Sequence, residues 1–152
     1  MNYLKKVADF HETFNAPILD KPKIPSKDRC ELRVELIAEE LKELKDAIKN
    51  NDLNEVADAL CDLQYVLSGT ILEFGLGEKF NELFKEVQRS NMSKASETME
   101  DALETLEHYK NKDGTKGYIK EIGEKWVCYR NSDNKVLKSI KYSPVDFSKI
   151  LE

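Results

Sequence analysis

The stretch EELKELKDAIKNNDLNEVADALCDL, residues 39–63, decides how this chain of 152 residues folds. On both sides of the NND triplet at 50–52, apolar residues recur with the period of an α-helix, which predicts two helices. Helices joined by so short a connection pack as antiparallel neighbours. The same stretch places several acidic residues where the two helices are expected to meet.

The first of these helices is predicted over about 27–50 and is amphipathic. When each residue is given about 100° of rotation, Glu40 falls inside the apolar arc and Glu43 falls at its edge. Glu39 lies one step further out, toward Glu35, which we expect to be solvated. Glu40 is therefore expected to face away from bulk water, with Glu43 at the boundary.

The second helix is predicted from an Asp52 N-cap to about Phe74, and between residues 56 and 72 it has only two charged side chains. A helix that is apolar on nearly every side is typical of a buried position. Glu55, Asp58 and Asp62 have i, i+3, i+7 spacing, so they share one stripe. We expect this stripe to lie inside the fold.

Buried carboxylates cost several kcal/mol each unless protons, basic partners or metal ions neutralise them. Few basic residues are available on the facing sides, and hard divalent cations prefer oxygen ligands, so a metal site explains the pattern best. Antiparallel packing of the two helices would bring Glu40 and Glu43 opposite Glu55 and Asp58. Two alternatives are a solvated face with Glu–Lys pairs and a helix start whose acids favour the dipole, although Asp62 fits neither.

The remainder of the chain predicts a mainly α fold with a small C-terminal β-meander. Further helices are expected over about 3–14, 78–89 and 96–110, and three prolines make 15–26 an extended connector. Beyond residue 116, the segments GYIKEIGEKWVCYR and KVLKSIKY alternate in polarity, and NSDN between them has turn chemistry. We therefore expect two or three strands there, followed by an irregular tail.

Composition restricts the classes of function. The chain is 40% hydrophobic and 35% charged, and it has no run apolar enough for a membrane span. The start MNYLKKVADFHETF has no signal-peptide pattern and the three cysteines form no CxxC pair, so we expect a cytoplasmic protein with reduced thiols. A net charge of −5 with interspersed signs argues against a nucleic-acid partner.

The acidic pattern resembles a known family. EExxE followed by ExxD, here Glu39 to Glu43 and Glu55 to Asp58, is similar to the signature of the MazG-like all-α nucleoside triphosphate pyrophosphohydrolase superfamily. The segments DFHETFNAPI, ADALCDLQYVLSGT and EVQRSNMSK resemble the branch of phosphoribosyl-ATP pyrophosphohydrolase and dimeric dUTPase-like enzymes. KVLKSIKYSP resembles the end of that branch, so the similarity covers about 5–95 and 135–150.

This resemblance implies a MazG-like antiparallel helical bundle that hydrolyses a nucleoside triphosphate to the monophosphate and pyrophosphate. Mg²⁺, with Mn²⁺ as a possible substitute, would be held by Glu40, Glu43, Glu55 and Asp58. Glu39 would be the catalytic acid that orients or deprotonates the attacking water. Asp62 would be an additional ligand or would support one.

The resemblance also assigns substrate contacts and an assembly. Arg89 and Lys94 would bind phosphate, Asn91 would add a polar contact, and Asn15 would reach the base or sugar. The protein would be a homodimer or a dimer of dimers, with substrate sites near the interface. Residues 1–95 would form the catalytic bundle, and residues 96–152 would add a helix, the β-meander and the tail, packed on the same domain.

Several functions remain open on the sequence. We expect hydrolysis of (d)NTPs for nucleotide-pool housekeeping, with pyrimidine deoxynucleotides favoured. Phosphoribosyl-ATP hydrolysis in histidine biosynthesis is one alternative, and a non-catalytic helical interaction module is another. A di-iron bundle is set aside because neither His11 nor His108 has a Glu three residues before it.

Overall fold

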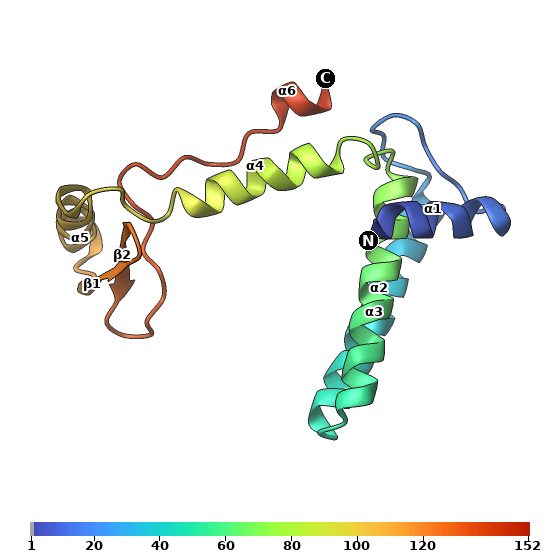
Figure 1. Cartoon of the computed structure of the whole chain (residues 1–152), viewed down its shortest axis with the longest axis horizontal. Helices are drawn as coiled ribbons and strands as arrows, with labels where there is room; N and C mark the ends of the chain where they lie inside the picture. Colours follow the sequence, from blue (N-terminus) through green and yellow to red (C-terminus); the bar gives the residue numbers. More distant parts are fainter. Residues whose placement is uncertain (1) are drawn as a thin grey trace. The chain divides into compact units, whose positions relative to one another are not determined.

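The computed structural model describes residues 2–152, which form six helices and one two-stranded antiparallel sheet (Figure 1). The predicted mainly α class with a small C-terminal β element is confirmed. The chain divides into an N-terminal unit that ends at Phe80 and a C-terminal unit, Asn81–Glu152. The assignment of catalysis to residues 1–95 stays a prediction.

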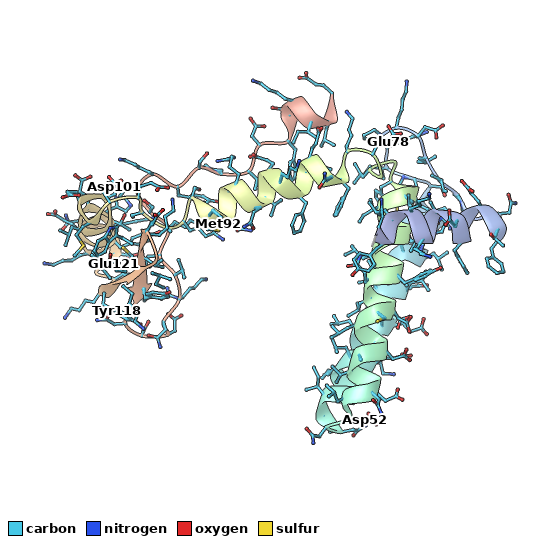
Figure 2. All side chains as sticks on the ribbon, viewed as in Figure 1. Asp52, Glu78, Met92, Asp101, Tyr118 and Glu121 are labelled. Carbon is cyan, nitrogen blue, oxygen red and sulfur yellow. The ribbon has the colours of Figure 1, made fainter. Side chains whose placement is uncertain are left out.

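The N-terminal unit contains α1 (Tyr3–Thr13), α2 (Lys27–Lys49) and α3 (Leu53–Glu73). The helices α2 and α3 lie side by side and antiparallel, and α1 packs against α3 (Figure 1). Figure 2 places Asp52 at the connection between α2 and α3. Its carboxylate accepts hydrogen bonds from the backbone N–H groups of Asn54 and Glu55, at 3.0 and 3.2 Å, as expected of an N-cap.

Two contacts fix the register of the α2–α3 pair. Arg29 binds Glu73, and the guanidinium group of Arg33 faces Gly69. Facing residues on the two antiparallel helices therefore have numbers that add up to about 102. The same register puts Glu40 opposite Asp62.

The prediction that α3 is buried is wrong for the single chain. Leu60 and Leu67 are 51% and 44% exposed, and the carboxylates of the predicted inner stripe, Glu55, Asp58 and Asp62, are exposed as well. The reason is geometric: within the described part of the N-terminal unit, α1 and α2 cover two sides of α3 and leave the others open. The apolar faces of α3 are thus available to another surface.

The C-terminal unit contains most of α4 (Phe80–Met92), followed by α5 (Met99–Asp113), β1 (Gly117–Ile122), β2 (Lys125–Arg130) and α6 (Ser148–Leu151). The core of this unit lies between α5 and the sheet and consists of Ala102, Cys128 and Leu137, with Leu106, Tyr109, Ile119 and Trp126 packed against it. No helix within residues 2–152 combines the length and apolar character needed to cross a membrane.

The sheet is a hairpin rather than a three-stranded meander. Tyr118 of β1 pairs with Tyr129 of β2, and the turn falls at Gly123, whose φ of 62° favours glycine. KVLKSIKY contributes only an isolated bridge between Tyr129 and Val136. Lys135 and Leu137 exchange backbone hydrogen bonds with β2, and two residues further on the N–H of Ser139 donates to the carbonyl of Lys94 instead.

Candidate metal and phosphate sites

Five carboxylates gather on one side of the α2–α3 pair. Glu40 is half-buried, and its neighbours Glu39, Glu43, Asp58 and Asp62 are exposed. Burial raises the pKa of Glu40, and the negative charges of Glu43, Asp62, Glu39 and Asp58 raise it further. These four carboxylates are therefore close enough to Glu40 to repel its charge; Glu43 and Asp58 were expected beside Glu40, and Glu55, the fourth member of the expected group, is not among them.

The helix register separates Glu55 from Asp62. Glu55 lies seven residues before Asp62 on α3, which is about 10 Å along the axis at 1.5 Å per residue. The charge of Asp62 acts on Glu40, as expected of a residue directly opposite. The sequence named Glu55 as a ligand and Asp62 as an additional one, and both roles stay predictions. The sequence does contain a signal that favours Asp62 over Glu55 as the partner of Glu40. If the two antiparallel helices are paired outward from the turn at residue 51, Glu40 and Asp62 lie at equal distances from it.

The carboxylates are not assembled into a finished metal site. Among residues 2–152, no group of three or more His, Cys, Asp or Glu side chains could hold a metal ion. The donors are all carboxylate oxygens, which suit Mg²⁺ or Mn²⁺, and a divalent cation would relieve the crowding that raises the pKa of Glu40. The carboxylate oxygens around Glu40 are therefore suitable ligands for Mg²⁺ or Mn²⁺.

A buried polar network lies at the far end of the same helix pair, and the sequence reasoning missed it. Glu73 is 1% exposed and accepts hydrogen bonds from Arg29 and Arg33. Arg33 also donates to Nε2 of His11 at 3.2 Å, while Nδ1–H of His11 donates to the carbonyl of Pro17 at 2.9 Å. His11 is therefore the neutral Nδ1–H tautomer and has a packing role.

The signal for this network was present in the sequence. Arg29 and Arg33 are four residues apart at the start of α2, so they share one face. An antiparallel partner brings the end of α3, where Glu73 lies, against that face. The two arginines of α2 are thus used at Glu73, and no ion pair joins a basic side chain to the carboxylates around Glu40 among the described residues.

Asn15 follows α1 with an exposed side chain and a φ of 54°. Asn adopts this left-handed conformation more readily than most residues, and the next N–H, that of Ala16, donates to the carbonyl of His11. The backbone therefore gives one reason for Asn15 at this position. Its contact with a base or sugar stays a prediction.

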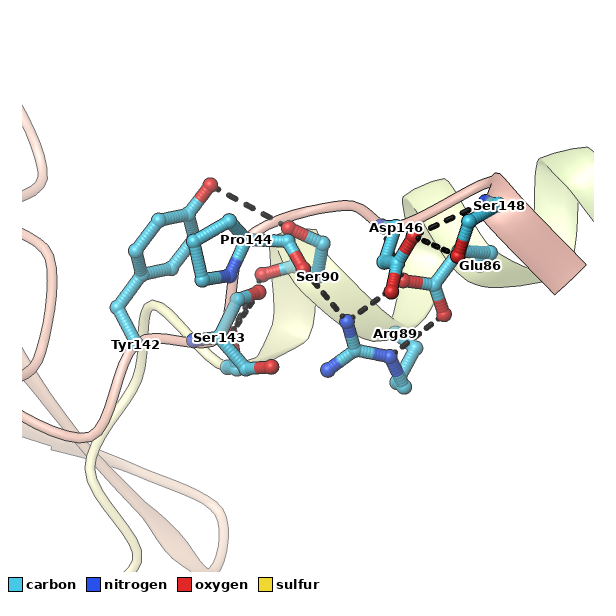
Figure 3. Close-up of polar contacts among 9 residues, drawn as sticks. Glu86, Arg89, Ser90, Tyr142, Ser143, Pro144, Asp146 and Ser148 are labelled. Carbon is cyan, nitrogen blue, oxygen red and sulfur yellow. Dashed lines mark hydrogen bonds and ion pairs between the residues drawn. The ribbon is translucent and has the colours of Figure 1, made fainter.

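Three of the predicted substrate-binding residues, Arg89, Asn91 and Lys94, lie on α4 and just beyond it, in the C-terminal unit. Arg89 donates from Nε and Nη2 to Glu86, both at 2.7 Å, and from Nη2 to the carbonyl of Pro144 at 2.9 Å (Figure 3). Lys94 donates to Oδ1 of Asn91 at 2.7 Å. The structure therefore brings Asn91 and Lys94 together and gives Arg89 a carboxylate partner that the sequence did not predict.

A family model described as phosphoribosyl-ATP pyrophosphohydrolase matches residues 7–91, more than half of the chain. The chain belongs to this family. The phosphoribosyl-ATP pyrophosphohydrolase family is part of the MazG-like superfamily, so the predicted relationship is confirmed. The matched range contains Asn15, the carboxylates from Glu39 to Asp62, Arg89 and Asn91. Lys94 and the whole segment 92–152 lie beyond it.

A similar curated protein gives no information on the substrate. "Uncharacterized protein L479" of Acanthamoeba polyphaga mimivirus is 24% identical over 245 residues, which cover 99% of this chain and 96% of the relative. Because the alignment is longer than 152 residues, the viral protein contains segments that this chain lacks.

Proposed function

We propose that this chain is a metal-dependent pyrophosphohydrolase that converts a (d)NTP to the (d)NMP and pyrophosphate. Family membership supports the reaction type. The observation that carries the proposal is the gathering of Glu39, Glu43, Asp58 and Asp62 around the half-buried Glu40; burial, and then these charges, raise the pKa of Glu40. Within residues 2–152, none of these carboxylates forms an ion pair with a basic side chain, so their charge is available to a cation.

In this proposal Glu40, Glu43, Glu55 and Asp58 hold Mg²⁺, for which Mn²⁺ substitutes, and Asp62 is a further ligand or supports one. A bound divalent metal withdraws charge from a triphosphate and stabilises the leaving pyrophosphate. Without that charge, the carboxylates would repel a polyphosphate, so substrate binding requires the cation.

The remaining groups act on the water and on the substrate. Glu39 orients the attacking water and accepts a proton from its oxygen. Arg89 and Lys94 bind phosphate oxygens, and Arg89 would use Nη1, since Nε and Nη2 bind Glu86 and Pro144. Asn91 adds a polar contact, and Asn15 contacts the base or sugar.

The assembly that we propose is a homodimer formed through the open faces of α3, with a dimer of dimers as the larger form. Leu60 and Leu67 leave an exposed apolar surface there. A hollow of about 480 Å³ between α1 and α3 continues this surface and is lined by Tyr3, Lys6, Val7, Leu60, Cys61, Gln64, Tyr65 and Ser68. A second copy would bury apolar area that the single chain leaves in water.

The test is pyrophosphate release from a panel of dNTPs, NTPs and phosphoribosyl-ATP with Mg²⁺. Wild type is compared with Glu40→Gln, Asp58→Asn and the matched control Glu35→Gln on the same helix as Glu40. We expect selective release from pyrimidine dNTPs, lost in the two site variants and kept in the control. Absence of release from every substrate, with no effect of metal on stability, would favour the interaction module.

Phosphoribosyl-ATP is the second candidate substrate, because the matching family model carries that description. Release from phosphoribosyl-ATP, with none from simple dNTPs or NTPs, would assign the chain to histidine biosynthesis rather than to nucleotide-pool housekeeping. The same carboxylate variants would abolish either reaction, so the substrate panel alone separates the two candidates.

A further inference from the structure

The C-terminal segment from residue 142 to 148 is hydrogen-bonded along α4 (Figure 3). The N–H of Ser143 donates to the hydroxyl of Ser93 at 2.9 Å, and Arg89 donates to the carbonyl of Pro144 at 2.9 Å. Further along, the N–H of Asp146 donates to Oε1 of Glu86 at 2.9 Å. These bonds run over two turns of α4, so the segment has a defined place on the helix.

Upstream contacts fix Lys138 and Tyr142 at the end of α4. The N–H of Ser139 donates to the carbonyl of Lys94 at 3.0 Å, and its hydroxyl accepts a hydrogen bond from the buried Ser96 at 3.1 Å. The hydroxyl of Ser90, itself 1% exposed, donates to the Tyr142 hydroxyl at 3.3 Å. The side chains of Lys138 and Tyr142 therefore lie beside residues of α4.

The ammonium groups of two lysines lie near the Tyr142 hydroxyl. The ammonium group of Lys138 is 4.3 Å from the centre of the Tyr142 ring. The hydrogen bond from Ser90 lowers the pKa of Tyr142, and the charges of Lys138 and Lys94 lower it further. Both lysines are therefore near this hydroxyl.

These two lysines have no negative partner in the part of the chain that the structure describes. In the same unit, Lys125, Arg130 and Lys141 each pair with a carboxylate. Lys94 binds only the neutral amide oxygen of Asn91, and Lys138 lies on an aromatic ring. A pair of uncompensated ammonium groups beside two hydroxyls has the donors and charge that phosphate oxygens require.

We propose that Lys138 and Tyr142 of the C-terminal segment join Lys94 and Ser90 of the α4 region in one polyphosphate-binding site. The inference rests on the proposed function and deepens it, because it assigns substrate contacts to residues beyond the family match at 7–91. Lys94 and Lys138 bind phosphate oxygens, and the Tyr142 hydroxyl donates a hydrogen bond to the same anion. The hydrogen bonds that Ser93 and Glu86 accept from the segment, and the one that Arg89 donates to it, hold the segment in position for this contact.

The first test measures binding of inorganic pyrophosphate to the full chain by calorimetry. We expect Lys138→Ala to weaken binding about three- to tenfold, the range for one partly exposed charged contact. Lys138→Arg should keep most of the affinity, and Tyr142→Phe should weaken it while leaving the ring in place. Lys149→Ala, which removes another exposed lysine of the C-terminal segment, should leave the affinity unchanged.

The second test measures steady-state kinetics with the nucleotide that the wild type hydrolyses. Lys138→Ala should raise KM several-fold and change kcat less than about twofold, because phosphate binding changes while the carboxylates do not. A role only in folding would instead lower the melting temperature and reduce the active fraction, with KM unchanged. That result would overturn the inference.

The two tests separate this inference from the proposed function. If the wild type releases pyrophosphate from a nucleotide, but Lys138→Ala alters neither pyrophosphate affinity nor KM, the site is wrong and the function stands. If no nucleotide is hydrolysed, but pyrophosphate binds and Lys138→Ala weakens it selectively, the function is wrong and the anion site stands.

Discussion

Gly69 of α3 lies directly against the guanidinium group of Arg33 on α2. A Cβ atom at residue 69 would stand 2.7 Å from Nη1 of Arg33 and 3.0 Å from Nε2 of His11. Arg33 has little freedom to move away, since it is bound to Glu73 and His11. The absence of a side chain at Gly69 therefore sets how closely α2 and α3 approach.

The Gly69→Ala variant should be less stable than the wild type by about 1–3 kcal/mol, the range for overpacking a filled interior. The added methyl group would displace Arg33 from its partners. Urea unfolding followed by circular dichroism measures the change. Gly77→Ala is the control, because its Cβ would meet only Leu72, at 3.2 Å. Equal stabilities of wild type and Gly69→Ala would show that Arg33 can move to accommodate the methyl group without loss of its contacts to Glu73 and His11.

The buried Glu73 makes stability depend on pH. Its hydrogen bonds and ion pairs with Arg29 and Arg33 outweigh the effect of burial and lower its pKa. Because the folded pKa lies below the unfolded value of about 4.3, this stabilisation is present above that pH and is lost as the pH falls through the folded pKa.

Replacing Glu73 with Gln should lower stability at pH 7 by about 3 kcal/mol, since two arginines lose a buried partner. The loss should shrink as the pH falls below about 4.3, because the unfolded wild type then takes up a proton at Glu73 that the folded state does not bind until its lower pKa is reached. Unfolding curves between pH 2.5 and 7 measure this, with the exposed Glu78→Gln as the control. A difference that stays constant over this range would contradict the ionised role of Glu73.

Local signals in the sequence were sufficient for most helix boundaries. Asp52 caps α3 as predicted, and α2 ends within a residue of the expected position. The later helices are shifted: α5 begins at Met99 because the Thr98 side chain caps it, and it continues to Asp113. Capping residues thus decide boundaries that periodicity alone leaves two or three residues uncertain.

Burial and pairing could not be predicted as well, because they depend on partners distant in sequence. Apolar residues all around α3 indicated a buried helix, whereas one chain alone covers only part of it. The residues of KVLKSIKY alternate as in a strand, but only residues 135–137 hydrogen-bond to β2, and the N–H of Ser139 donates to the distant carbonyl of Lys94. Glu73 was overlooked because its partners lie some 40 residues earlier in the chain.

Divalent metal should stabilise the N-terminal unit if the carboxylates around Glu40 bind it. At a Mg²⁺ concentration 100 times the dissociation constant, the gain is about 2.7 kcal/mol and appears as a higher melting temperature. Glu40→Gln and Asp62→Asn should reduce this gain, while Glu35→Gln should keep it. If Asp62→Asn behaves like wild type, Asp62 does not take part in metal binding.

Glu86 should titrate far below an ordinary glutamate. Hydrogen bonds from Arg89, followed by the backbone N–H of Asp146, lower the pKa of Glu86 to about 2. The contact between α4 and the C-terminal segment should therefore persist as the pH falls to about 3. Carbon-13 NMR of the Glu86 carboxyl group measures the pKa, which should return toward about 4.3 in Arg89→Ala. An ordinary pKa in the wild type would mean that the segment is not held on α4 in solution.

The open faces of α3 should make the protein a dimer in solution. Leu60 and Leu67 are exposed in the single chain, and burying such side chains contributes roughly 1.5–3 kcal/mol each. Sedimentation should therefore give twice the chain mass of 17.5 kDa, and Leu60→Glu or Leu67→Glu should return it toward one chain. Leu103→Glu on α5, another exposed leucine, is the matched control and should remain dimeric. A wild type that sediments as a single chain at micromolar concentration would contradict the proposed dimer.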